Sequence, residues 1–353
     1  MGFEPARGGA DARPQNAAPI DRRPLNAVQI ALLIGSILAG VALGLGLLAQ
    51  AFVHIPTDVR RLGILHRALQ SGEPSPEIVV FGNSVLMSGV DGQALTAALP
   101  GNPVAWNCAS TGQTLLESYL LSQDLPTTVE TAVYSVFPQP DHDVEPLNAQ
   151  KYNSLFMYGF RPEPATLETV RESFEPDVLA LLERSTVAQI FASRWAVRQF
   201  VDTRARSLLR SDLALDKATF DLFHPQSYLR PIDPEITQGF IDRRLEAFET
   251  APPVLETGAI ELARALVRNA EARGRSTVFL FPPLHPEIVR KIGPQLGLLH
   301  AEFARLFDEA AGVRVVDATE LLDRSVFIDD LHPTNDGAAI LSRMLADALR
   351  EDR

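Results

Sequence analysis

The feature that most constrains the fold of this chain is an uncharged apolar stretch over residues 27–48. Its sequence is AVQIALLIGSILAGVALGLGLL, in which Gln29 and Ser36 are the polar residues. A helix of this length rises about 33 Å, enough to cross the hydrocarbon core of a bilayer. The stretch is longer than the roughly 7–15 apolar residues of a signal peptide, and a core helix that is apolar on every side is unusual. We therefore predict a transmembrane helix over residues 27–50, in preference to a cleaved signal peptide or a core helix.

The charges beside this stretch predict its orientation. Residues 1–26 are rich in Ala, Pro, Gly and Arg, a composition typical of a disordered arm. Arg13, Arg22 and Arg23 precede the stretch, whereas Arg60, Arg61 and Arg67 follow it at a greater distance. Because positive flanks stay in the cytoplasm, we expect a single span in the cytoplasmic membrane with the N-terminus inside. A connector over residues 51–76 then leads to one extracytoplasmic domain over residues 77–353.

The composition excludes several classes of protein. The chain has 353 residues, a net charge of −12 and one cysteine, Cys108. It contains no basic stripe interleaved with aromatic residues, so nucleic-acid binding is not expected. A lone cysteine forms no intrachain disulfide, and the sequence has neither a CxxC pair nor an HExxH motif. We therefore expect no metal site and no cofactor, while 46% hydrophobic residues predict a sizeable buried core.

Five short apolar or β-branched runs alternate with helical patterns after the connector. The predicted strands are residues 77–81, 103–107, 131–137, 276–281 and 312–317, and the clearest helical patterns are residues 113–123, 257–273, 286–311 and 334–350. Near-continuous apolar strands are typical of a parallel sheet covered on both faces. The sequence therefore predicts an α/β fold, a three-layer, doubly wound, flavodoxin-like sheet of about five strands. Residues 150–253 interrupt this alternation of strands and helices, and we expect them to form a helical insertion between the third and fourth strands.

Two short motifs fall where such a sheet binds ligands, outside the carboxyl ends of its strands. Ser84 closely follows the first predicted strand, and His332 precedes the last predicted helix, three residues after Asp329. A serine nucleophile needs a base within hydrogen-bond reach, and the base needs a third group that sets its tautomer. The candidates are Ser84 as nucleophile, His332 as base and Asp329 as orienter, with Asp330 expected to be solvated. Considered alone, Ser84 is equally interpretable as a turn residue or helix cap, and His332 as a residue that leads into the last helix.

Together, Gly82-Asn83-Ser84 and Asp329-x-x-His332-Pro333 resemble the first and last motifs of the SGNH (GDSL-type) hydrolase superfamily. The resemblance covers roughly residue 78 to the C-terminus, excluding the insertion. It implies the sheet predicted above and the same roles for the serine, the histidine and the aspartate.

The resemblance also implies an oxyanion hole, whose donors are each worth about 3 kcal/mol to the transition state. In the family these donors are the backbone N–H of the serine, here Ser84, a glycine after the second strand and an asparagine after the third. Gly112 matches the glycine by position, but the asparagine is missing, and Gln139 is the nearest amide. Asn83 stands where the family usually has aspartate. Asn83 and His285 are candidates for substrate contact, and His285 is equally interpretable as a turn residue.

The layout of anchor, divergent first motif, insertion and late Asp-x-x-His is similar to that of membrane-anchored members of the superfamily, such as alginate O-acetylation proteins and the D-alanyl transfer protein of teichoic acid modification. This resemblance implies an O-acyltransferase or acylesterase that works on a cell-envelope glycan, with an acyl donor and sometimes a multipass membrane acyltransferase as partners. Two alternatives remain open. One is an anchored lipase or esterase, and the other is a catalytically degenerate binding or assembly subunit.

Overall fold

The computed structural model describes residues 26–52, 61–73, 75–140, 155, 159–187, 222–223, 233–255 and 258–350. The chain forms two units, Met1–Gly44 and Leu45–Arg353, which are described separately. Predictions for residues 1–25 and for parts of the connector and the insertion fall outside the described residues.

The apolar stretch forms helix α1 (Ala27–Phe52). Its segment Ala27–Gly44 is not buried against any other part of the protein, and large apolar side chains such as Leu32 and Leu43 are exposed. Among the described residues it is the one helix long and apolar enough to cross a membrane. An exposed apolar surface of this length is stable in hydrocarbon and unfavourable in water.

Five parallel strands form the central sheet of the second unit. They are β1 (Ile78–Phe81), β2 (Ala105–Asn107), β3 (Thr131–Ser135), β6 (Ser276–Phe281) and β7 (Val313–Asp317), arranged in the order β2-β1-β3-β6-β7. All neighbouring pairs are parallel. The predicted α/β class and the five strands of a parallel sheet are thereby confirmed, because each strand lies within or beside its predicted run.

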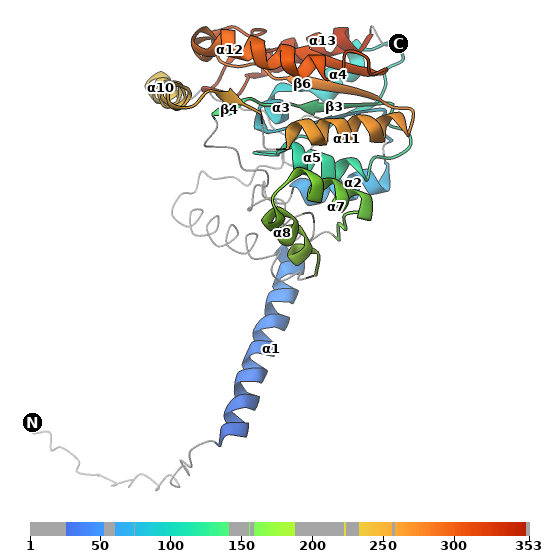
Figure 1. Ribbon diagram of the computed structural model, residues 1–353, viewed down its shortest axis with the longest axis vertical. Coiled ribbons are helices and arrows are strands. Elements are labelled where there is room, and N and C mark those ends of the chain that lie inside the picture. The colour runs from blue at the N-terminus through green and yellow to red at the C-terminus, as the bar shows by residue number, and fades with distance from the viewer. Residues whose placement is uncertain are drawn as a thin grey trace, which may run out of the picture. The chain divides into compact units, whose positions relative to one another are not determined.

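Helices cover both faces of this sheet (Figure 1). Successive strand residues alternate between the faces, so Val79 and Phe81 enter one apolar core while Ile78 and Val80 enter the other. The helices that contribute to the first core include α2 (Arg61–Ser71), α5 (Leu115–Ser122), α11 (Ala259–Glu271) and the C-terminal part of α12 (Pro286–Arg305). Those of the second core are α3 (Ser84–Gly89), α4 (Gly92–Ala98) and α13 (Asn335–Arg350).

A second, two-stranded sheet joins the two ends of the region that follows β3. Strand β4 (Gln139–Pro140) pairs in antiparallel fashion with β5 (Pro253–Val254). Between these strands lie α7 (Pro164–Ser173), α8 (Pro176–Val187) and α10 (Pro234–Thr250), all within the predicted insertion. A short 3-10 helix, η4 (Arg324–Val326), precedes the segment that contains His332. Helix α10 packs on α12.

Candidate active site

The turn after β1 places Ser84 at the start of helix α3. Gly82 is required there, because a Cβ atom at this position would lie 2.6 Å from the Cβ atom of Ser135 in β3. Asn83 caps the helix, and its side-chain oxygen accepts a hydrogen bond of 3.1 Å from the backbone N–H of Val85. The close approach of this turn to the end of β3 and the helix cap together hold the hydroxyl of Ser84 at the carboxyl edge of the sheet.

His332 lies in a closed loop, Phe327–Pro333, which we call the catalytic loop after the role predicted for His332. Its two ends form an antiparallel bridge, and the N–H of Ile328 donates to the carbonyl of His332 at 2.9 Å. Inside the loop, one carboxylate oxygen of Asp329 accepts hydrogen bonds from the backbone N–H groups of Leu331 at 2.8 Å and His332 at 2.7 Å. Local hydrogen bonds therefore set the direction of the His332 side chain.

The three candidate side chains form one hydrogen-bonded series. The Ser84 Oγ atom lies 2.9 Å from Nε2 of His332, and Nδ1 of His332 lies 2.7 Å from Oδ2 of Asp329. The serine is half-buried, and the His332 side chain is 17% exposed, so the site can be reached from solvent. The expected proximity of these side chains is confirmed, and the arrangement satisfies the geometric requirement for an activated serine.

The electrostatics favour an ionised Asp329. Burial alone would raise its pKa, but the hydrogen bond and charge of the His332 ring, together with the backbone N–H groups of His332 and Leu331, outweigh burial and lower the pKa of Asp329 below 3.8. Near neutral pH the carboxylate is therefore charged. A charged carboxylate keeps a proton on Nδ1 of His332 and leaves Nε2 able to accept the proton of Ser84.

The residues predicted for the oxyanion hole lie in three different elements. The backbone N–H of Ser84 is in the first turn of α3, where N–H groups have no partner within the helix. Gly112 is exposed, with a φ of +59°, in a turn after β2. This turn is joined to the one that precedes Ser84 by a hydrogen bond of 2.9 Å from the N–H of Ser110 to the carbonyl of Gly82. Gln139 is half-buried in β4. Their roles as oxyanion donors stay predictions.

His285 has contacts that favour a structural role. It precedes α12 as its N-cap, where its Nδ1 atom accepts a hydrogen bond of 3.3 Å from the N–H of Glu287. The residue is 1% exposed, and its ring packs edge-on against Phe327 of the catalytic loop at 5.3 Å. Burial lowers its pKa more than the neighbouring Glu287 raises it, which keeps the ring neutral. Substrate contacts by His285 and by Asn83 stay predictions.

The expectation that Asp330 is solvated was wrong. Asp330 is buried, and its carboxylate pairs with the guanidinium of Arg244 in α10, with Nε and Oδ2 2.5 Å apart. The partner lies 86 residues away in the chain and is one of two adjacent arginines in a charged helix, so sequence reasoning missed it. A buried carboxylate without a partner is costly, which explains why the pair forms.

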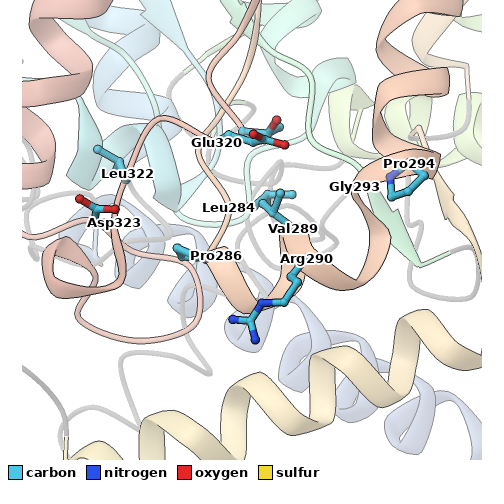
Figure 2. A pocket seen from close by; sticks show the side chains of 10 residues that line it. Leu284, Pro286, Val289, Arg290, Gly293, Pro294, Glu320, Leu322 and Asp323 are labelled. Atoms are coloured by element: carbon cyan, nitrogen blue, oxygen red, sulfur yellow. The ribbon is translucent and has the colours of Figure 1, made fainter.

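The unit Leu45–Arg353 also contains a cleft of about 500 Å³ (Figure 2). It lies between the N-terminal half of α12 and the segment that follows β7, with Leu284 in its wall and Arg290, Glu320 and Asp323 at its margin. None of Ser84, His332 and Asp329 lines it. No group of three His, Cys, Asp or Glu side chains that could hold a metal ion occurs within the part of the chain that the structure describes.

No protein-family model matches the sequence, and none of the curated proteins matches it. The function is therefore inferred from the geometry of Ser84, His332 and Asp329 and from the position of these residues in the sheet.

Proposed function

We propose that this chain is a membrane-anchored, SGNH-type serine acyl-transfer enzyme that works on a cell-envelope glycan. The observation that carries the proposal is the series of two hydrogen bonds, 2.9 Å from Ser84 to His332 and 2.7 Å from His332 to Asp329. Ser84 and His332, which lie 248 positions apart in the chain, meet there, and an ionised Asp329 orients the histidine. A serine that served only as a cap or turn residue would need neither the His332–Asp329 hydrogen bond nor a histidine side chain that solvent can reach.

The position of Ser84 in the sheet supports the same proposal. Numbered along the chain, the five parallel strands lie in the order 2-1-3-4-5, which is the order of flavodoxin-like sheets. Ligands of such sheets bind at the point where the strand order reverses, between the first and third strands. Ser84 follows β1, which lies between β2 and β3, so the nucleophile stands at that point.

The chemistry follows from the arrangement. The Ser84 oxygen attacks the carbonyl carbon of an acyl ester while its proton moves to Nε2 of His332, and Asp329 stabilises the imidazolium. The oxyanion that forms is stabilised by the N–H of Ser84 and, in this proposal, by Gly112 and Gln139. Collapse of the tetrahedral species breaks the bond to the leaving alcohol, which takes the proton from His332. The acyl group stays on Ser84 as an ester until a second hydroxyl attacks in the same way.

The acceptor in this second step is proposed to be a sugar hydroxyl. Water competes for the acyl-enzyme, but a bound and aligned acceptor has an effective concentration of about 10⁵ M or more. Helices α7, α8 and α10 lie outside the five-stranded sheet, and we propose that they form the surface that holds the glycan. Helix α1 supports attachment to the cytoplasmic membrane, with the catalytic unit proposed to be on the periplasmic side, where a multipass acyltransferase can supply the acyl donor.

The test uses the full chain purified in detergent. A fluorescent phosphonate should label the wild type at Ser84 but not Ser84→Ala, and a small chromogenic ester should be turned over slowly. Adding the envelope glycan should accelerate turnover and produce acylated glycan. Rapid hydrolysis of the small ester without any glycan acylation would replace this proposal with an anchored esterase or lipase. An absence of both labelling and turnover would favour a catalytically degenerate binding or assembly subunit.

A further inference from the structure

The inserted helix α10 contacts the catalytic loop through polar side chains. The guanidinium of Arg244 pairs with the carboxylate of Asp330, with Nε and Oδ2 2.5 Å apart. About two helical turns away, the hydroxyl of Thr237 donates to the carbonyl of Ile328 at 3.4 Å. Both contacts join α10 to residues that adjoin Asp329 in the chain. The inserted helix is therefore attached to the loop on either side of the residue that orients His332.

Apolar packing reinforces this attachment. Leu245 and Phe248 of α10 belong to a small apolar cluster that includes Leu331 of the catalytic loop. The same cluster contains Val85, the residue that follows the nucleophile, and its other members are Phe137, Leu284, Ile288, Val289, Ile292 and Leu296. Helix α10 thus shares one apolar cluster with Leu331 of the loop that carries the base and with Val85, which adjoins Ser84 in the chain.

The ion pair has a specific electrostatic role in this packing. Asp329 and Asp330 are adjacent and both buried, so the loop holds two carboxylates within one turn. Asp329 is held by the ring of His332 and by two backbone N–H groups, while Asp330 is held by Arg244. Without the guanidinium, Asp330 would be a buried charge that lacks this partner, so its carboxylate would turn toward water. A turn toward water would displace Asp329 and the hydrogen bonds that it accepts.

We propose that Arg244 is a positioning residue, which fixes the catalytic loop through Asp330 and so keeps His332 within reach of Ser84. The inserted region then contributes to the geometry of the active site as well as to the surface around it. This inference rests on the proposed function for its catalytic consequence, but its structural part, the attachment of the loop by α10, is measurable in the absence of any activity.

The first measurement is hydrogen exchange at the backbone amides of Leu331 and His332, both of which donate to Asp329. In full-length Arg244→Met we expect these amides to exchange at least about tenfold faster than in the wild type, because local opening becomes easier. Arg244→Lys restores a positive charge and should recover part of the protection. Arg243→Met is the matched control, since Arg243 is exposed on the same helix and contacts Phe240 and the carbonyl of Gly239. Its loop amides should exchange at the wild-type rate.

The second measurement is the rate at which a phosphonate labels Ser84. A displacement of about 1 Å in the base costs on the order of 100-fold in rate, so Arg244→Met should be labelled about 10–100 times more slowly. With a chromogenic ester, kcat should fall while KM stays near its wild-type value, because Arg244 does not contact the substrate in this proposal. Arg244→Lys should recover part of the labelling rate and of kcat. If Arg244 only stabilised the fold, Arg244→Met and Arg244→Lys would instead both have a lower fraction of folded protein.

The outcomes separate the two claims. Wild-type exchange at Leu331 and His332 in Arg244→Met overturns the positioning role, whatever the activity. Faster exchange in Arg244→Met than in the wild type, together with a wild type that phosphonates never label, would support the attachment of the loop and refute the proposed function. If Arg244→Met does not fold, Asp330→Asn decides instead, because it removes the ion pair from the loop side. Faster exchange in that variant supports the inference, and wild-type exchange overturns it.

Discussion

Replacement of Asp329 by asparagine separates the catalytic role of this residue from its structural one. The Asp329 carboxylate accepts backbone hydrogen bonds from Leu331 and His332 on one oxygen and faces the His332 ring with the other. An asparagine keeps the first oxygen and presents an NH₂ group to Nδ1 of His332. The ring then places its proton on Nε2, 2.9 Å from the Ser84 oxygen, and can no longer accept the serine proton.

The expected magnitudes differ for activity and stability. Loss of the correct tautomer should lower the rate of phosphonate labelling and kcat by about 10³–10⁴-fold. The free energy of unfolding should change much less in Asp329→Asn than in Asp329→Ala. The alanine variant leaves both half-buried N–H groups of the loop without their acceptor, at a cost of about 1 kcal/mol each, the low end of the range for unsatisfied groups.

The assay combines labelling kinetics with urea unfolding of the three proteins, wild type, Asp329→Asn and Asp329→Ala. The reasoning predicts an inactive but stable asparagine variant and an inactive, destabilised alanine variant. Retention of more than about a tenth of the wild-type labelling rate by Asp329→Asn would contradict the base–orienter assignment. Equal destabilisation of the two variants would contradict the proposed hydrogen bonding of the loop.

Three further predictions follow from packing and titration. Gly82→Ala should lower the free energy of unfolding by about 1–3 kcal/mol and slow labelling, since the new Cβ meets Ser135. Gly239→Ala, with open space around it, should stabilise α10 by up to about 1 kcal/mol. Equal unfolding midpoints of the two variants would refute the close approach of Gly82 to β3. The Cys108 thiol is buried and its pKa is raised to about 12 by desolvation, so it should resist maleimide until the protein unfolds, and rapid native labelling would show that burial to be wrong. Because the pKa of Asp329 is lowered in the folded state, its stabilising contribution is complete at pH values above 3.8 and is lost as the pH falls through the folded pKa. The difference in the free energy of unfolding between wild type and Asp329→Asn should therefore shrink in acid. A constant difference from pH 6 to about 2 would contradict a lowered pKa of Asp329 in the folded state.

Features that depend on neighbours in the chain were predictable from the sequence. The uncharged stretch that became α1 and the five apolar runs that became the parallel strands depend on composition and periodicity over a few residues. The three-residue spacing of Asp329 and His332 likewise let a carboxylate reach a ring nitrogen within one turn of the loop. Such distances are set by backbone geometry, so local sequence is enough to predict them.

Features that depend on distant segments were decided by the tertiary structure. The 2.9 Å contact between Ser84 and His332 requires the strand order that brings the end of β1 beside the loop before α13. The pairing of Asp330 with Arg244 could not be predicted, because an acid in a polar loop looks solvated until a helix from another part of the chain covers it. Burial and charge pairing depend on packing in three dimensions, and residues far apart in the chain carry no periodic signal of their contact.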